Sequence, residues 1–447
     1  MTETATGVRA VARVGSTPQP PPGTPEMRPA KRSGQLGPVH ILQLLVVEAL
    51  VVTAVALLGQ GVLVALPVAL VAAVLCIAVL ARSRGRWWLE QWRITRMFRH
   101  RRAARPAGGP ADELADLHLL APGLSITELG RAGAAPDSSE TTDLGQLARD
   151  DEQAPDAEAH AVVAVARDPA GWYAVAEIEP TTVMADQPAS PVPLPMLART
   201  LAATGQAGVL LQVVTQASPA TSPTVQPPPQ AARSYQDLLK EIGSGPAPVN
   251  RVSWLVVRLE EHRLAVAGAD GDVHERAPVV VAALLRRAVH TLQRVGLSAG
   301  PLDRPALLAA LRQGCGLPAG PEGPHEEWNG WRSGHLVHSC FWISEWPAPP
   351  RVPALLHRLA TIPAMQTTVA TIVAVPPADL EADVLDAPLG EAELRCLVRV
   401  ATTSDRLADA QSAVVKSAEE LGARVQRLDG EQAPAVYATA PTGGGRW

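Results

Sequence analysis

Residues 41–80 read ILQLLVVEALVVTAVALLGQGVLVALPVALVAAVLCIAVL, and Glu48 is the only charged side chain among them. Two apolar runs, Ile41 to Leu58 and Val62 to Leu80, are separated by Gly59-Gln60-Gly61. A helix needs about 20 predominantly apolar residues to cross the hydrocarbon core of a bilayer. Each run has about that length, so residues 38–81 are predicted to form a transmembrane hairpin whose two ends lie on one side of the membrane.

The charges around this hairpin predict its orientation. Nine arginines and a single acid, Glu90, lie between Arg82 and Arg105, and Arg28, Lys31 and Arg32 precede the first run. Cytoplasmic flanks of membrane helices are enriched in Arg and Lys. We therefore expect a protein of the cytoplasmic (inner) membrane with two transmembrane helices and both termini in the cytoplasm.

The arginine-rich stretch, residues 82–106, is predicted to be a basic juxtamembrane helix that leaves the membrane through the headgroups. Tryptophans interleave with its arginines, as in an interfacial aromatic belt, and Ile94 and Phe98 lie one helical turn apart. Each basic residue near an anionic leaflet contributes about 1 kcal/mol, so anionic lipids are expected partners. Arginines directly beneath a membrane usually act as topological anchors, and nucleic acid is therefore not an expected partner. The predicted membrane-interface residues are Arg82, Arg84, Arg86, Trp87, Trp88, Trp92, Arg93, Arg96 and Arg99.

A small-residue face in the second apolar run is the candidate helix-packing surface. Ala65, Ala69 and Ala73 follow the small-xxx-small spacing that allows membrane helices to approach closely. Alanine is common throughout the chain, so chance accounts for this spacing equally well. Glu48 in the first run is interpreted as a tolerated or intersubunit-paired acid, because a two-helix hairpin cannot enclose an ion path.

The remaining residues, 107–447, are enough for a large folded domain, and the chain is 47% apolar. Cys76, Cys315, Cys340 and Cys396 are widely spaced and form no CxxC motif, which fits a reducing compartment. Residues 1–37 are proline-rich and are predicted to be a disordered tail. Two low-complexity loops, 131–158 and 217–234, are predicted to be spacers.

Alternation and helical periodicity predict an α/β fold for this domain. In its middle part we expect strands at His160–Arg167, Gly171–Glu179, Ala207–Gln216 and Arg251–Glu260, with helices at Pro195–Ala203 and Ala277–Val295. In the last third we expect strands at His335–Ser344, Gln366–Val375, Glu393–Ala401 and Ala423–Leu428, with helices at Val352–Ala360 and Asp405–Leu421. The last third has the βαββαβ order of a split βαβ, ferredoxin-like unit. The middle part has the same order with its final strand missing or displaced, so a tandem pair of such units is predicted.

Several motifs suggest catalysis or metal binding, and their contexts argue against it. Gly296-Leu297-Ser298-Ala299-Gly300 matches GxSxG, but a nucleophile elbow needs a strand before the serine, and a helix is predicted there. His335, His338 and Cys340 are too few for a closed zinc site, because strand alternation leaves only His338 and Cys340 on one face. No GxxxxGK[ST] phosphate-binding loop occurs. Catalytic residues, cofactors and metals are therefore not expected.

The architecture and several motifs resemble EccE, a membrane component of the actinobacterial type VII secretion system. The resemblance rests on the tight hairpin, the exit segment Arg84-Gly85-Arg86-Trp87-Trp88, and a large domain after it. It also rests on Trp254-Leu255-Val256-Val257-Arg258-Leu259, the helix running into Val295-Gly296-Leu297, the Leu307 to Leu311 stretch, and the segment from Trp328-Asn329-Gly330-Trp331 to Trp346-Pro347.

The resemblance implies a non-enzymatic scaffold subunit of an ESX-like secretion complex, assembled with EccB, EccC and EccD. In that family EccC is the ATPase, and EccE offers no catalytic residues to carry over. A membrane-anchored α/β enzyme acting on a lipid or cell-envelope substrate is the alternative hypothesis. It would require convergent acids, bases or a nucleotide site, and the sequence identifies none.

Overall fold

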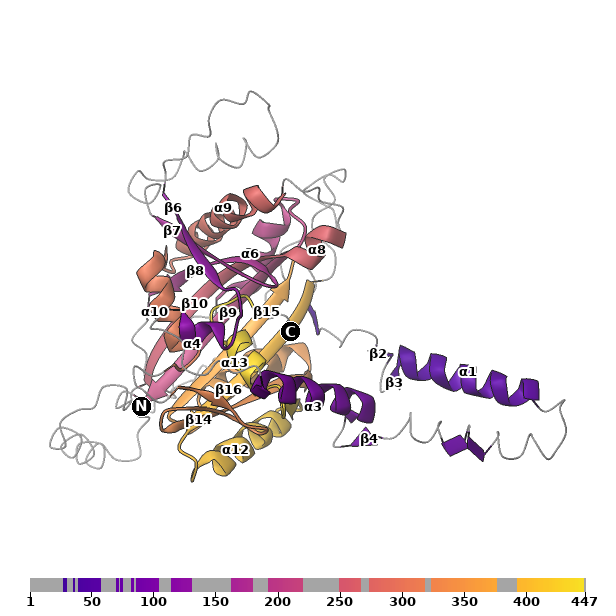
Figure 1. The fold of residues 1–447 in the computed structure, drawn as a ribbon. Coiled ribbons are helices and arrows are strands. Elements are labelled where there is room, and N and C mark those ends of the chain that lie inside the picture. Colours follow the sequence, from indigo (N-terminus) through magenta and orange to yellow (C-terminus); the bar gives the residue numbers. More distant parts are fainter. Residues whose placement is uncertain are drawn as a thin grey trace, which may run out of the picture.

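The computed structural model describes residues 27–29, 35–36, 39–57, 70–71, 73–74, 82–83, 86–103, 114–130, 162–179, 192–219, 249–266, 273–317, 323–375 and 392–445. Its centre is a 13-stranded sheet in which the hydrogen-bonded path runs β12-β13-β14-β16-β15-β9-β10-β8-β7-β6 (Figure 1). All pairs along this path are antiparallel. The predicted large α/β domain is therefore present, with an antiparallel sheet.

The last third contains the predicted βαββαβ order. Its elements are β14 (Leu336–Glu345), α11 (Val352–Ala360), β15 (Gln366–Ala374), β16 (Ala392–Thr402), α12 (Leu407–Glu420) and β17 (Arg424–Arg427). The strands lie in the order β17-β14-β16-β15. Side chains of α11 and α12, including Leu355, Leu359 and Val414, pack on alternate residues of the strands such as Phe341 and Val398. This is the strand order of a split βαβ unit.

The middle third repeats this arrangement. Its elements are β8 (Gly171–Ile178), α6 (Leu194–Ala202), β9 (Val209–Pro219), β10 (Val249–Glu260), α9 (Val273–Arg294) and β11 (Ala299–Pro301). The order in the sheet is β11-β8-β10-β9, with β11 paired to the end of β8. The final strand that the sequence left missing or displaced is thus β11, which is only three residues long.

The two units join edge to edge through β9 and β15. These strands pair from Thr367↔Ala217 to Ala374↔Leu210, so the sheet is continuous across the junction. Val373 pairs with Leu211, and both pack in the core beneath α6 and α9. Val369 lies on the same face of β15, four residues away, and packs beneath α11 and α12. All four helices therefore cover one face of the sheet.

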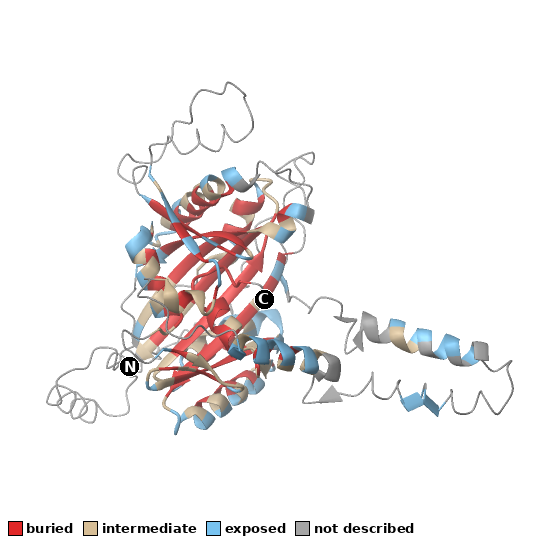
Figure 2. Cartoon of the chain, in the orientation of Figure 1, coloured by how far each residue is buried: buried red, intermediate tan, exposed pale blue. Residues whose placement is uncertain are grey.

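The opposite face carries a second core, formed by helices that the sequence did not predict. These are α4 (Ala115–His118), α10 (Arg304–Gly314) and α13 (Gln432–Thr439). The sheet is buried between the two layers, as the red strands in Figure 2 show. β6 (Ser125–Leu129) and β7 (Val163–Asp168) extend the first unit, and β12 (His325–Glu326) and β13 (Trp331–Ser333) extend the second.

Two boundaries predicted from composition are wrong. Met27–Pro29, placed in the disordered tail, forms β1 and pairs in parallel with Ala392–Leu394 of β16. Ala217 to Pro219, placed in the second spacer loop, continue β9 because their backbone pairs with β10. The predicted loop at residues 131–158 lies outside the described residues, as do most of residues 1–37 and the remainder of 217–234.

The predicted hairpin is described only in part. The first apolar run forms α1 (Ile41–Leu57), preceded by the short strands β2 (Gln35–Leu36) and β3 (Val39–His40). Of the second run, only residues 70, 71, 73 and 74 are described, and they are helical. Among the described residues, no helix combines the length and the apolar character needed to cross a bilayer. The basic juxtamembrane stretch contains β4 (Arg82–Ser83), β5 (Arg86–Trp87) and α3 (Trp88–Ala103).

A buried polar network fixes the C-terminal segment to the first unit. Arg258 of β10 forms an ion pair with Asp168 at the end of β7, and their side chains are 0% and 2% exposed. Arg258 Nη1 also donates to the Thr442 carbonyl at 2.6 Å, and the Tyr437 hydroxyl donates to Asp168 Oδ2 at 2.9 Å. Burial raises the pKa of Tyr437 well above its usual value, so the phenol stays neutral and serves as a donor.

Replacing Asp168 by Asn should be strongly destabilising, because it leaves the guanidinium of Arg258 buried without its counter-charge. Asn keeps the oxygen that accepts from Ala170 N at the turn, but its NH2 group replaces the oxygen that accepts from Tyr437 and Arg258. We expect the free energy of unfolding to fall by about 3–5 kcal/mol, measured by urea titration of the purified chain. Asp409→Asn, at an exposed position of α12, is the matched control and should stay within about 0.5 kcal/mol of the wild type. Equal stability of the two variants would contradict this role.

Candidate functional site

The most distinctive surface of the described chain is formed where the arginine-rich helix α3 docks on the domain. Ile94 and Phe98 are only 4% and 8% exposed, whereas Trp92 and Met97 on the same helix are each 52% exposed. Ile94, Phe98 and Arg101 follow the i, i+4, i+7 spacing that places them on one face of the helix. The apolar pair that the sequence singled out therefore contacts protein.

The partner surface consists of two loops, one between β12 and β13 and one between β17 and α13. The Phe98 ring meets Trp328 edge to face, with centroids 5.3 Å apart. Gly430, at φ +76°, lies against the side chains of Trp328 and Ile94, and its N–H donates to the Trp328 carbonyl at 2.6 Å. A Cβ at this position would lie 2.6 Å from the Trp328 ring and 2.8 Å from an Ile94 methyl group. Only glycine therefore permits this close approach.

Arg101 anchors the same face of α3 with a bidentate ion pair. Its Nε and Nη2 donate to the two carboxylate oxygens of Glu326, each at 2.9 Å, and Nη2 also donates to the Gly430 carbonyl at 2.6 Å. The Glu326 side chain is only 6% exposed. Such a fork-to-carboxylate pair fixes both orientation and position.

Glu326 also connects α3 to the interior of the domain. Its Oε1 accepts a hydrogen bond from Ala433 N, in the first turn of α13, at 3.0 Å. A carboxylate at this position satisfies a helix N–H and interacts favourably with the positive end of the helix. The far end of α13 carries Tyr437, which donates to Asp168. Polar contacts therefore link α3 through α13 to Asp168 at the end of β7.

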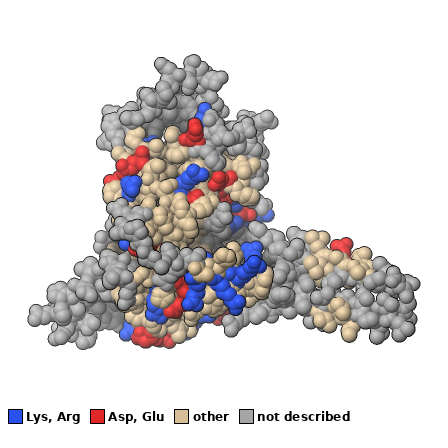
Figure 3. Space-filling view, in the orientation of Figure 1, with Lys and Arg blue, Asp and Glu red and all other residues tan. Residues whose placement is uncertain are grey.

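The remaining faces of α3 are exposed and basic. Arg93, Arg96, Arg99 and Arg102 are all exposed, and Figure 3 shows a band of Lys and Arg atoms over this helix. The Arg96 guanidinium lies 5.6 Å from the centroid of the Trp92 ring, a cation–π distance. The helix thus presents positive charge and an aromatic ring away from the domain.

The structure brings together part of the predicted membrane-interface set. Trp92, Arg93, Arg96 and Arg99 lie on exposed faces of α3, and Trp88 begins this helix. Arg82 lies in β4, whereas Arg86 and Trp87 lie in β5, and Arg84 lies outside the described residues. In the helix-packing set, Ala65 and Ala69 lie outside the described residues, and Ala73 is helical and exposed. Both sets remain predictions.

Glu326, Trp328 and Gly430 were not predicted as members of this site. They lie more than 200 residues from α3 in the sequence, and no local pattern predicts such a contact. The available signal was the Ile94 and Phe98 pair, because an isolated apolar stripe on a basic helix indicates a surface that it covers.

Two of the three candidate metal ligands lie in a buried part of β14. His338 and Cys340 are fully buried on the face that packs on α10 and α13, and His335 precedes the strand. The described residues contain no group of three or more His, Cys, Asp or Glu side chains placed to hold a metal ion. Arg399 lies nearby and donates to the Gly314 carbonyl and to Thr368 Oγ1.

Burial, with the positive charge of Arg399, lowers the pKa of His338 well below its usual value. Neither ring nitrogen has a hydrogen-bond partner among the described residues. In the unfolded chain His338 titrates near pH 6.5, so below that pH the unfolded state binds a proton that the native state does not. This difference destabilises the fold as the pH falls.

The free energy of unfolding should therefore decrease between pH 6.5 and pH 5, by up to about 1.4 kcal/mol per pH unit from this group. His338→Leu should remove that part of the slope, as measured by urea titrations at a series of pH values. His335→Gln, at an exposed position three residues away, is the control and should retain the slope. An unchanged slope in His338→Leu would show that other groups cause it.

The comparisons with known proteins concern the segment that contains Glu326 and Trp328. Residues 247–343, from β10 into β14, match the family model described as "EccE: Putative type VII ESX secretion system translocon, EccE". The search of curated proteins finds no match. The matched segment contains Trp254 to Leu259, Leu307 to Leu311 and Trp328, which carried the resemblance drawn from the sequence. This match confirms the resemblance to the EccE family over residues 247–343.

Proposed function

We propose that this protein is a membrane-anchored, non-enzymatic scaffold subunit of a type VII secretion complex in the cytoplasmic membrane. The family match supports the secretion assignment. The observation that carries the scaffold proposal is that segments on both sides of the apolar stretch contact one domain. The domain would thereby hold the membrane hairpin at both of its ends.

The segment before the apolar stretch is β1. It pairs with β16 in the register Met27↔Ala392, Arg28↔Glu393 and Pro29↔Leu394. On that edge β14 covers only Leu397 to Thr402 of β16, so β1 occupies an otherwise open part of the edge. The segment after the apolar stretch is α3, held by Arg101 and Phe98. The chain leaves the domain after Pro29 and contacts it again at α3. Both ends of the intervening hairpin would therefore lie on the side of the membrane that holds the domain.

This arrangement supports the topology expected from the arginines, with residues 38–81 in the membrane and the domain in the cytoplasm. In α1, Val51, Val52 and Val55 are more than half exposed, and an apolar surface of this kind suits lipid or another membrane subunit. Other membrane subunits of the complex, of the EccB, EccC and EccD type, are the proposed protein partners. The alanine face of the second apolar run is the proposed packing surface.

Anionic lipids are the proposed partners of the exposed arginines of α3. Four exposed arginines at about 1 kcal/mol each would hold α3 against an anionic leaflet. In the enzyme alternative, Ser298 would be the nucleophile. It lies on the exposed connection from α9 to β11, where its carbonyl accepts from Glu179 N at 3.0 Å. A helix enters and an edge strand leaves, which is not the strand-to-helix turn that an elbow requires.

The topology can be tested with alkaline phosphatase, which is active only outside the cytoplasm. We expect activity when the enzyme is fused after Gln60, in the turn of the hairpin, and no activity when it is fused after Trp447. A cytoplasmic reporter at the same two positions should give the opposite pattern. Phosphatase activity from the fusion at Trp447 would overturn the proposed orientation.

The role of α3 as the rigid connection can be tested with Arg101→Gln. This change removes the bidentate pair but leaves Glu326 as the cap of α13, and we expect α3 docking to weaken by about 1–2 kcal/mol. Amide hydrogen exchange over residues 88–103 should become faster. After co-expression with the membrane subunits and purification, a native gel should show less of the assembled complex. Arg93→Gln, on an exposed face of the same helix, is the matched control for the exchange measurement, because it removes the same charge without a contact to Glu326. Faster exchange together with full assembly would show that docking of α3 is not needed for the scaffold.

A further inference from the structure

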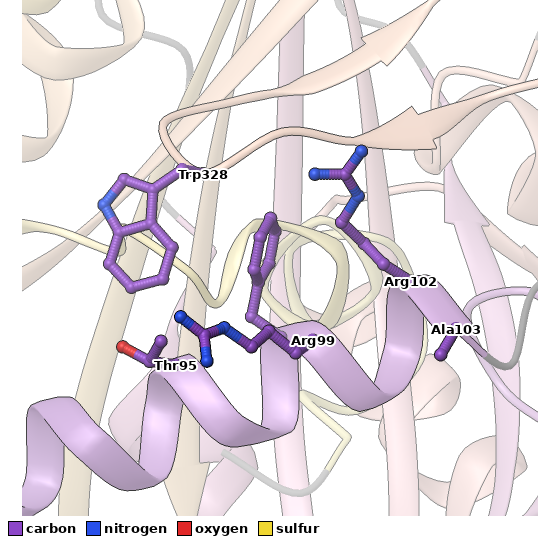
Figure 4. A pocket seen from close by; sticks show the side chains of 6 residues that line it. Thr95, Arg99, Arg102, Ala103 and Trp328 are labelled. Carbon is purple, nitrogen blue, oxygen red and sulfur yellow. The ribbon is translucent and has the colours of Figure 1, made fainter.

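An open depression lies between α3 and the domain, beside the docking face (Figure 4). Its volume is about 510 Å³, and it is lined by Thr95, Phe98, Arg99, Arg102, Ala103 and Trp328. This volume is within the range of about 300–1,000 Å³ typical of small-ligand sites. Trp328 comes from the domain and the other lining residues come from α3. The depression therefore exists only while α3 is docked.

The lining suits an anionic oxygen ligand with an apolar portion. Arg99 and Arg102 line the depression from different sides, and the planar forks of their guanidinium groups match the geometry of phosphate oxygens. No carboxylate of the described residues pairs with either arginine, so both are available to an external anion. Figure 4 shows Arg99 extending toward Thr95 and Trp328, with Arg102 on the other side of the depression.

The remaining lining residues favour one kind of phosphate ester. The Thr95 hydroxyl donates to the Gln91 carbonyl at 2.8 Å and keeps its lone pairs, so it can accept from a hydroxyl group of a ligand. Arg102 lies over the Phe98 ring at 5.8 Å, which leaves an apolar floor beside the charge. A phosphodiester that carries hydroxyl groups satisfies both features, whereas the cationic choline substituent would face two arginines.

The position of the depression indicates where such a phosphodiester comes from. α3 begins at Trp88, shortly after the second apolar run ends at Leu80, and Trp92 and Met97 are exposed on it. Exposed aromatic and apolar side chains among arginines are typical of helices at a bilayer interface. We infer that this depression binds the headgroup of an anionic, hydroxyl-bearing membrane phospholipid, with Arg99 and Arg102 holding its phosphate. The inference rests on the proposed function, because it requires α3 at the membrane surface.

A lipid bound in this way would stabilise the docked position of α3. Trp328 is the lining residue that comes from the domain, so a headgroup that also packs against its ring would bind the docked state more tightly than an undocked one. The composition of the leaflet would thereby influence how firmly the hairpin is held on the domain.

Native mass spectrometry of the full chain in a neutral detergent tests this site. The probes are phosphatidylglycerol, phosphatidylcholine and inorganic phosphate, titrated separately. Each arginine is expected to contribute about fivefold to the affinity for phosphatidylglycerol. The Arg99→Gln/Arg102→Gln variant should therefore bind this lipid about 25-fold more weakly. Arg406→Gln/Arg424→Gln, at two exposed sites remote from α3 in sequence, removes the same charge and should bind like the wild type. Arg99→Lys/Arg102→Lys should bind with intermediate strength, because it keeps the charge without the fork.

Three results would overturn the assignment: equal loss in both Gln pairs, phosphatidylcholine binding as tightly as phosphatidylglycerol, or inorganic phosphate binding as tightly as the lipid. The last result would indicate a site for soluble phosphate. Hydrogen exchange over residues 88–103 in the same samples verifies that α3 remains docked in each variant. The measurement needs no partner subunits, so failure of the headgroup site is distinguishable from failure of the scaffold proposal, which is judged by membrane topology and co-purification.

Discussion

The buried ion pair of Arg258 and Asp168 is the interaction on which the rest of the structure depends. It lies on the sheet face opposite the four covering helices, where Arg258 also binds the Thr442 carbonyl and Asp168 receives the Tyr437 hydroxyl. Such a pair adds little net stability compared with apolar packing, but breaking it leaves a charge without a partner in the interior. It therefore specifies how α13 and the final turn lie across the sheet. Gln212 reinforces this placement, because it bonds Ala438 on one side and Gly443 on the other.

This constraint matters because the two split βαβ units share one sheet. Within the sheet, their junction is the pairing of β9 with β15. α13 packs on β14, β15 and β16 of the second unit, while the residues after it contact Arg258 of the first. The C-terminal segment therefore spans the junction on this face of the sheet. Gly443 and Gly444 permit this, because a Cβ at either position would lie within 2.7 Å of Arg258 or Ile372.

The sequence predicted the second unit almost element by element, because its strands alternate and its helices α11 and α12 each have one apolar stripe. The sequence did not predict β11 of the first unit, because three residues are too few to show strand alternation. It also did not predict α13, which is buried on all sides and so has no amphipathic stripe. The candidate site was predicted only in part. Exposed arginines on α3 follow from composition, but the Arg101 and Glu326 pair joins residues 225 positions apart. Such a contact becomes visible only once the fold places them together.

α3 both docks on the domain and presents charge away from it, and its sequence pattern alone does not show which side chains do which. Ile94 and Phe98 could have been lipid-facing, yet they are covered by Trp328 and Gly430, and the arginines are left outside. Because only one narrow stripe of α3 is docked, most of the helix surface remains exposed and can contact another surface. Because Arg101 belongs to the stripe and Arg99 and Arg102 do not, neighbouring arginines on α3 have different physical roles. One is neutralised by a carboxylate within the domain, while the others keep their charge for whatever lies beyond it.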